Sequence, residues 1–257
     1  MHNYLNYNGL AIIPHRGGAT EAPENTLASF EYSVDLGAEI IETDVQVSAD
    51  GIPYIFHDNN LLRITGVNKT FSQCNSKEID QIKIFKNHHI PKLEEVLHKF
   101  PNTKFQIDLK TDDVVEPALK ILNKFNTQKE NICLASFSSS RLNRARKLID
   151  GVIFSMGPNE IVKMKLKNIG FKINHIQGDF MQVPIYRYGL KIVTKSFVSF
   201  VQEQNVKIAV WTINKESEMK YLIELGVDGI ITDVPNKLKN LINFCLLYTS
   251  PSPRDGT

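Results

Sequence analysis

Residues 39–47 read EIIETDVQV and combine the pattern of a buried strand with a pair of acidic side chains. The isoleucines and valines are β-branched residues that favour a strand, and the run has the length of one. Side chains at positions i and i+2 of a strand point to the same side, so Glu42 and Asp44 should emerge together. The segment therefore predicts a strand that carries two carboxylates to one edge of a sheet.

Short apolar runs and longer amphipathic segments alternate on both sides of this strand. The expected strands lie at 10–14, 39–47, 104–109, 132–136, 152–155, 173–177, 207–212 and 229–232. The expected helices lie at 24–36, 93–100, 114–125, 138–148, 159–167, 195–203 and 216–225. This alternation implies parallel strands with right-handed crossovers, and eight units in 257 residues predict an α/β fold, the TIM (β/α)8 barrel. No GxGxxG follows the first strand, which disfavours a dinucleotide-binding fold.

Two segments depart from the regular alternation. The connection at 59–91, after the second strand, is long and polar, so we expect it to carry small elements or to wall the substrate site. Residues 245–257 do not continue the helical pattern of 236–244 and resemble a translated sequencing adapter. We therefore expect one barrel domain at 1–244 and a non-native or disordered tail at 245–257.

Composition limits the possible partners. The net charge of +2 gives no electrostatic reason to expect a nucleic-acid or membrane-surface partner. The three cysteines, Cys74, Cys133 and Cys245, are widely spaced and form no metal-binding pattern, so reduced thiols are expected. No secretion signal precedes the first strand, and no apolar run reaches the about 18 residues of a membrane span. We therefore expect a cytoplasmic protein without a membrane span; the sequence leaves its oligomeric state open.

Polar residues recur where the expected strands end. In parallel barrels, catalytic residues collect at the carboxyl ends of the strands. The residues at such ends are His15, Arg16, Glu42, Asp44, Asp108, Lys110, Trp211, Asn214 and Asp233, and His57 and Asp58 follow a further short apolar run at 53–56. Their repeated placement predicts an active site at the mouth of the barrel.

The acidic residues among them indicate a metal site. Glu42 and Asp44 repel each other unless a positive charge compensates them, and a hard divalent cation with oxygen ligands would do so. Asp108 would supply the third carboxylate. The competing interpretation is ordinary ion pairing with Lys or Arg, and the i, i+2 spacing of Asp108 and Lys110 also allows a plain ion pair.

The remaining strand-end residues fit phosphodiester chemistry. His15 and His57 could serve as proton acceptor and donor, since imidazole titrates near neutrality. Arg16 offers bidentate binding of a phosphate, and Lys110 could reach an anionic substrate. Trp211, the only tryptophan, would form a wall against an alcohol moiety or would simply pack in the core.

Taken in order, the motifs resemble the glycerophosphodiester phosphodiesterase family. The matching segments are His15-Arg16-Gly17, Pro23-Glu24-Asn25-Thr26, Glu42-Thr43-Asp44, His57-Asp58, Leu62-Arg63, Thr65-Gly66, residues 90–97, Trp211-Thr212-Ile213-Asn214 and residues 226–233. They span residues 10 to about 240. Single motifs are short, but the ordered set is specific.

The resemblance implies a barrel enzyme that hydrolyses glycerophosphodiesters to glycerol 3-phosphate and an alcohol. It makes His15 and His57 the acid/base pair, with Arg16 and Lys110 facing the phosphate. Glu42 and Asp44 become ligands of Mg²⁺ or Ca²⁺, and Asp108 stands where the family usually has a glutamate, one methylene longer. Water or the substrate's own glycerol hydroxyl would be the nucleophile.

Two rival functions remain open at this point. A phospholipase D- or C-like barrel would act on lysophospholipids or phosphoinositides and would need apolar residues near its mouth; the 59–91 connection offers Ile64, Phe71, Ile79, Ile84 and Phe85. A non-catalytic barrel would only bind a phosphodiester, because a fold alone does not imply a function. Such a barrel would be expected to lack a histidine or a carboxylate, and here these positions are all occupied.

Overall fold

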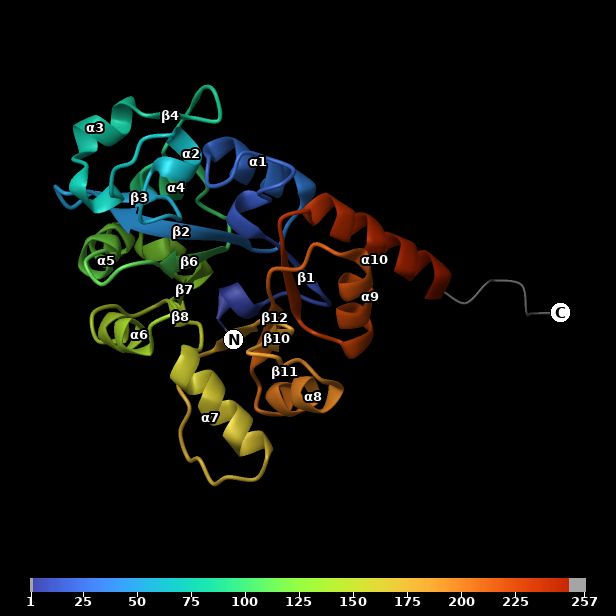
Figure 1. The fold of residues 1–257 in the computed structure, drawn as a ribbon. Helices are drawn as coiled ribbons and strands as arrows, with labels where there is room; N and C mark the ends of the chain where they lie inside the picture. The colour runs from blue at the N-terminus through green and yellow to red at the C-terminus, as the bar shows by residue number, and fades with distance from the viewer. Residues whose placement is uncertain (1, 250–257) are drawn as a thin grey trace.

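The computed structural model describes residues 2–249, in which eight parallel strands alternate with helices around a common centre (Figure 1). The strands are β1 (Ala11–Pro14), β2 (Ile41–Val47), β6 (Phe105–Leu109), β7 (Ile132–Ala135), β8 (Ile153–Phe154), β9 (Phe180–Val183), β12 (Lys207–Val210) and β13 (Gly229–Thr232). The helices between and after them are α1 (Leu27–Leu36), α4 (Leu93–Lys99), α5 (Val115–Lys124), α6 (Ser139–Arg146), α7 (Pro158–Asn168), α8 (Lys195–Glu203), α9 (Glu216–Leu225) and α10 (Pro235–Thr249). The predicted TIM barrel is confirmed.

The strands form two parallel sheets that together make the barrel wall. One has the order β1-β13-β12-β9, and β2-β6-β7-β8 follow one another in the second. A parallel bridge between Ser155 and Phe180 joins the two sheets at β8 and β9. Between β1 and β2 no strand ladder is formed in residues 2–249; instead the Ile12 N–H donates to the Glu39 carboxylate at 2.8 Å.

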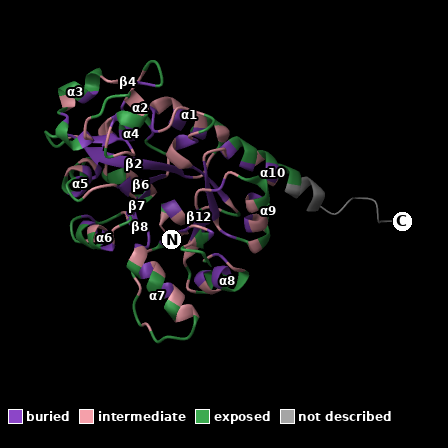
Figure 2. Ribbon diagram, viewed as in Figure 1, coloured by how far each residue is buried: buried purple, intermediate pink, exposed green. Residues whose placement is uncertain are grey.

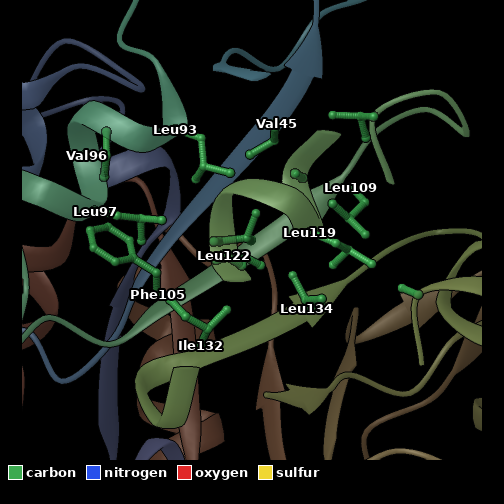
Figure 3. Close-up of a cluster of buried hydrophobic side chains, with 14 of the residues drawn as sticks. Val45, Leu93, Val96, Leu97, Phe105, Leu109, Leu119, Leu122, Ile132 and Leu134 are labelled. Carbon is green, nitrogen blue, oxygen red and sulfur yellow. The ribbon is translucent and has the colours of Figure 1, made fainter. Parts of the chain in front are cut away.

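Apolar residues fill the space between strands and helices, as Figure 2 shows by the buried strands and the exposed outer faces of the helices. In the largest cluster, α4 and α5 pack on β2, β6 and β7 through side chains such as Val96, Leu119 and Phe105 (Figure 3). The 3-10 turn η1 (Asn3–Leu5) closes the amino-terminal end of the barrel, where buried Tyr4 packs edge-on against Phe180 at 5.9 Å. The site must therefore open at the carboxyl ends of the strands.

The long connection after β2 is a small structured unit. It starts with β3 (Pro53–Ile55), antiparallel to β2, and continues through α2 (Leu62–Thr65), η3 (Phe71–Gln73), α3 (Ser76–Gln81), β4 (Lys83–Ile84) and β5 (His88–His89). Its apolar residues, Phe71 and Ile79 among them, form a core of their own. We expected His57 at the end of a barrel element, but it follows the hairpin strand β3, which is not one of the parallel barrel strands. The Phe56 N–H donates to the Asp44 carbonyl at 3.0 Å and keeps His57 at the mouth.

The structure differs from the sequence expectations in two segments. The strand expected at 173–177 is wrong: these residues have no regular structure, and the barrel strand is β9 a few residues later. The apolar residues around 173–177 are separated by exposed polar ones, whereas β9 is almost entirely buried. Helix α10 runs to Thr249, past the predicted boundary at 244. Residues 250–257 of the predicted tail lie outside the described residues, so the tail stays a prediction.

Candidate active site

The turn that follows β1, η2 (His15–Gly17), carries two predicted side chains into the mouth of the barrel. Its backbone is left-handed at Arg16 (φ 53°) and Gly17 (φ 78°), a region that favours glycine. A Cβ on Gly17 would collide with the side chain of Ser29 in α1. The Arg16 backbone N–H donates to a Glu42 carboxylate oxygen at 2.9 Å, which ties the turn to β2.

His15 is oriented by a carboxylate from the other end of the chain. Its Nδ1 lies 2.6 Å from Oδ1 of Asp233, directly after β13, and the Asn214 amide donates to the second Asp233 oxygen at 2.7 Å. Burial alone would lower the pKa of His15, but nearby Glu42 and the bond to Asp233 outweigh it and raise the pKa. With Nδ1 engaged, Nε2 is the nitrogen left for a substrate.

His57 has the same arrangement with its sequence neighbour. Its Nδ1 lies 2.6 Å from Oδ1 of Asp58, and Arg63 donates from Nε to the other Asp58 oxygen at 2.6 Å. Arg63 also donates hydrogen bonds from both terminal nitrogens to the two Glu24 oxygens, at 3.0 and 2.6 Å. Burial would raise the pKa of Asp58, but hydrogen bonds from Arg63 and His57 hold it below its ordinary value. Asp58 is therefore a charged partner for the imidazole.

Three buried carboxylates lie beside the histidines. Glu42 and Asp44 project from β2, and Asp108 is the direct partner of Asp44 in the register of β2 and β6. Burial and the Asp44 charge raise the pKa of Glu42 to about 7. Burial also raises the pKa of Asp108. At Asp44 burial acts in the same direction, but Lys110, His57 and Arg16 together outweigh it, so the pKa of Asp44 is lowered. The three groups repel one another, and Asp44 holds its charge most firmly.

Two cationic side chains compensate this charge. The Lys110 ammonium donates to Asp108 at 3.0 Å and to Asp44 at 3.2 Å, so the ion pair considered from the spacing is present. Arg16 donates from a terminal nitrogen to Glu24 at 3.0 Å, and its Nε lies 3.5 Å from an Asp44 oxygen. That Nε is buried without a hydrogen-bond partner.

The carboxylates are chemically suited to bind a metal ion, but in this structure they are not arranged around one point. Among residues 2–249, no group of three His, Cys, Asp or Glu side chains is arranged to hold a metal ion. Lys110 stands between two of the three predicted ligands. However, the second carboxylate oxygen of Asp108 is buried and has no hydrogen-bond partner. It is therefore free to bind a hard divalent cation, which prefers oxygen ligands. The donor set therefore suits Mg²⁺ or Ca²⁺ if the ammonium gives way.

A cavity of about 270 Å³ brings the predicted residues together. It is lined by all eight residues that were given a role from the sequence: His15, Arg16, Glu42, Asp44, His57, Asp108, Lys110 and Trp211. Trp211 packs edge-on against Phe137, with ring centroids 5.5 Å apart, and so forms part of the wall. A wider groove of about 700 Å³ adjoins the cavity at His57 and Lys110 and is walled by residues of the 59–91 connection. The structure brings these eight residues to one cavity, and their role as an active site stays a prediction.

Several residues of the site were given no role from the sequence. Asp233 and Asp58 hold the histidines, and Glu24 joins Arg16 to Arg63. Asn25, with a left-handed φ of 54°, donates to Asp44 at 3.0 Å. The only sequence signal was their position next to a strand end or inside a motif, which does not say which side chain they contact.

Comparison with known proteins places this site in a family context. A family model described as "Glycerophosphoryl diester phosphodiesterase family" matches residues 15–237. A glycerophosphodiester phosphodiesterase of Caldanaerobacter subterraneus subsp. tengcongensis is 30% identical over 249 residues, which cover 90% of this chain and 97% of that protein. A lysophospholipase D of Homo sapiens is 26% identical over 268 residues, covering 90% of this chain and 85% of its own length.

Solved structures show the same fold. A phosphodiesterase of Oleispira antarctica, in complex with the product sn-glycerol-3-phosphate, superposes with a TM-score of 0.78 at 23% identity. The match covers 91% of this chain and 97% of that one. The barrel therefore extends over nearly the whole chain, as in that protein.

Proposed function

This chain belongs to the glycerophosphoryl diester phosphodiesterase family, and on that premise we propose that it hydrolyses glycerophosphodiesters to sn-glycerol 3-phosphate and an alcohol. The relative that is 30% identical bears the name of this activity, and the solved neighbour from Oleispira antarctica holds the corresponding product. Both support the proposed substrate class.

The observation that carries the proposal is the pair of histidines in one cavity, each with Nδ1 held 2.6 Å from a carboxylate. Each bond fixes the tautomer and leaves Nε2 toward the substrate. One Nε2 accepts the proton of the attacking hydroxyl, from water or from the substrate's own glycerol. In the second case a cyclic phosphodiester forms, and a water molecule must open it in a further step to give sn-glycerol 3-phosphate. The other donates a proton to the alcohol oxygen as its bond to phosphorus breaks. Asp233 and Asp58 stabilise whichever imidazole is charged.

Lys110 and Arg16 supply the positive charge that the phosphoryl oxygens need. Both line the cavity, and both are now neutralised by carboxylates, at 3.0 Å for the Lys110–Asp108 contact and 3.0 Å for the Arg16–Glu24 contact. A phosphate that enters can share these donors, because lysine has three donor hydrogens and arginine five. Such fixed charges stabilise the transition state more than the ground state when they face the developing negative charge.

We further propose that Glu42, Asp44 and Asp108 hold a divalent cation, Mg²⁺ or Ca²⁺. The family generally depends on such a metal, and the partnerless oxygen of Asp108 supports a place for it here. When bound, the ion would add positive charge beside the phosphoryl oxygens. Since Asp108 is shorter than the usual glutamate, this position would set the metal preference.

A cytoplasmic location is part of the proposal. Cys74 and Cys133 are both free and buried, which fits a reducing compartment. No helix in the described range is long and apolar enough to cross a bilayer.

Hydrolysis of glycerophosphocholine with Mg²⁺, with Ca²⁺ and with EDTA tests the proposal. We expect sn-glycerol 3-phosphate to be released in the presence of a metal and not in EDTA. Binding of glycerophosphocholine without release of any product, by protein with an intact circular dichroism spectrum, would instead establish a non-catalytic barrel. Activity on a lysophospholipid alone would favour the phospholipase-like alternative.

A further inference from the structure

A two-stranded hairpin stands at the mouth of the barrel and was not expected from the sequence. It consists of β10 (Tyr186–Arg187) and β11 (Leu190–Lys191), between β9 and α8 (Figure 1). Because it follows β9 directly, it lies at the carboxyl ends of the strands, where the site opens. Pro184, Arg187 and Ile192, within and beside the hairpin, line the cavity that holds the two histidines.

The tip of the hairpin shows an aromatic side chain to solvent at a strained position. Tyr188 and Gly189 form a two-residue turn with left-handed φ angles of 51° and 76°. Such turns favour Asn or Gly at both positions, and a bulky residue there costs roughly 1 kcal/mol or more. Tyr188 is nevertheless 90% exposed, and Tyr186 and Leu190 beside it are 58% and 70% exposed. These side chains bury little surface, so their contribution to the stability of the fold does not explain their presence at the tip.

The charged residues along the chain segment that carries this tip are all basic. From Phe180 to Gln202 the chain has Arg187, Lys191 and Lys195 and no acidic residue. Lys191 and Lys195 are exposed. The total charge of +2 hides this local excess, because acidic residues elsewhere balance it. Exposed tyrosine and leucine beside lysine are the side chains that insert at the boundary between lipid head groups and acyl chains, with the basic groups on anionic lipids.

We propose that the hairpin docks the mouth of the barrel onto an anionic phospholipid surface. Two further exposed apolar side chains, Leu62 and Phe137, line the groove that adjoins the cavity at His57 and would face the same surface. Of the five apolar residues expected to play this part in the 59–91 connection, Phe71, Ile79 and Ile84 are buried in its own core and Ile64 packs against that core, whereas Phe85 is 38% exposed. A mouth held on a bilayer would receive substrates or release alcohols that carry an acyl chain.

Vesicle co-sedimentation tests the proposal without turnover, so its result is independent of the proposed function. The vesicles are phosphatidylcholine alone or with about one third phosphatidylglycerol, at low and at high salt. We expect binding to the anionic vesicles that weakens as salt rises, and little to the neutral ones. The double variant Tyr188→Ser/Leu190→Ser should bind at least about tenfold more weakly, because its anchors are lost.

The matched control is Ile169→Ser/Phe171→Ser. These two side chains are also exposed, 69% and 59%, but they precede β9 and so lie toward the amino-terminal end of the barrel strands. We expect this variant to bind vesicles as the wild type does, and both variants to hydrolyse soluble glycerophosphocholine normally. The proposal is overturned if the wild type ignores anionic vesicles, if both variants lose binding equally, or if the hairpin variant changes only the oligomeric state in analytical ultracentrifugation.

Discussion

Nδ1 of His15 lies 2.6 Å from Oδ1 of Asp233, although 218 positions separate the two residues in the chain. The contact exists because β1 and β13 are parallel neighbours whose ends meet at the mouth of the barrel. It gives His15 the charged partner that His57 obtains from the adjacent Asp58. Each imidazole therefore has a carboxylate on Nδ1, one by a long-range contact and the other by a local one.

Asp233→Asn should lower kcat about 10- to 100-fold with little change in KM. The substitution keeps the size of the side chain but removes the charge that stabilises and orients the His15 imidazole. Steady-state kinetics on glycerophosphocholine measures the two constants separately. Asp179→Asn is the control, since Asp179 accepts a hydrogen bond from the Phe154 backbone before β9, away from the mouth. If kcat fell equally in Asp233→Asn and Asp179→Asn, Asp233 would have only a structural role and the prediction would be wrong.

Asp108→Asn should weaken divalent-cation binding at least about tenfold, measured by calorimetry with Mg²⁺ and Ca²⁺. One of three carboxylates would lose its charge. Asp108→Glu restores the longer side chain that the family usually has and should retain binding, with a changed preference between the ions. Unaltered binding in Asp108→Asn would remove this residue from the proposed ligands.

Gly17→Ala should destabilise the fold by at least about 2 kcal/mol, from left-handed strain and a clash with Ser29. Gly51→Ala provides the control: Gly51 has a similar φ of 82°, but its added Cβ would meet nothing within 4 Å. It should therefore cost only about 1 kcal/mol. Urea unfolding of both variants separates strain from collision; a smaller loss in Gly17→Ala than in Gly51→Ala would contradict the account.

Asp50 should contribute stability that disappears in acid. It accepts hydrogen bonds from Ser76 Oγ at 2.5 Å, from Ser48 Oγ at 2.7 Å and from the Ser76 backbone at 2.8 Å, and these bonds lower its pKa to about 2. A depressed folded-state pKa means that the contribution is complete above the unfolded value and is lost as the pH falls through about 2. Asp50→Asn should be less stable near neutral pH, by under about 1 kcal/mol since the group is exposed, and the difference should vanish in strong acid. A difference independent of pH in urea titrations would refute this.

The sequence predicts most of the barrel because its signals are local. The β-branched runs and the helical spacing identified seven of the eight barrel strands. The exception was the strand expected at 173–177, where the spacing of the apolar residues resembles that of a strand although none of these residues is buried. The short hairpin at Tyr186–Lys191 was not predicted, because two-residue strands are too short to show a periodic pattern. Its turn also has a tyrosine where Asn or Gly is usual.

The sequence predicts which residues form the site, but not which side chains contact one another. His15, Glu42 and Asp108 stand at strand ends, and strand ends meet in a parallel barrel. Which carboxylate holds a histidine, or whether Lys110 faces a phosphate or bridges Asp44 and Asp108, depends on side-chain distances that no spacing encodes. Those contacts required the three-dimensional structure.

The central claim is that His15 and His57 together move the protons of phosphodiester cleavage. The most direct test is kcat for sn-glycerol 3-phosphate release by His15→Ala and His57→Ala, beside His98→Ala, which removes an exposed histidine of α4. We predict that each active-site variant loses at least about a hundredfold in kcat while it still binds divalent metal, and that His98→Ala keeps wild-type turnover. Near-wild-type turnover in either His15→Ala or His57→Ala would contradict the account.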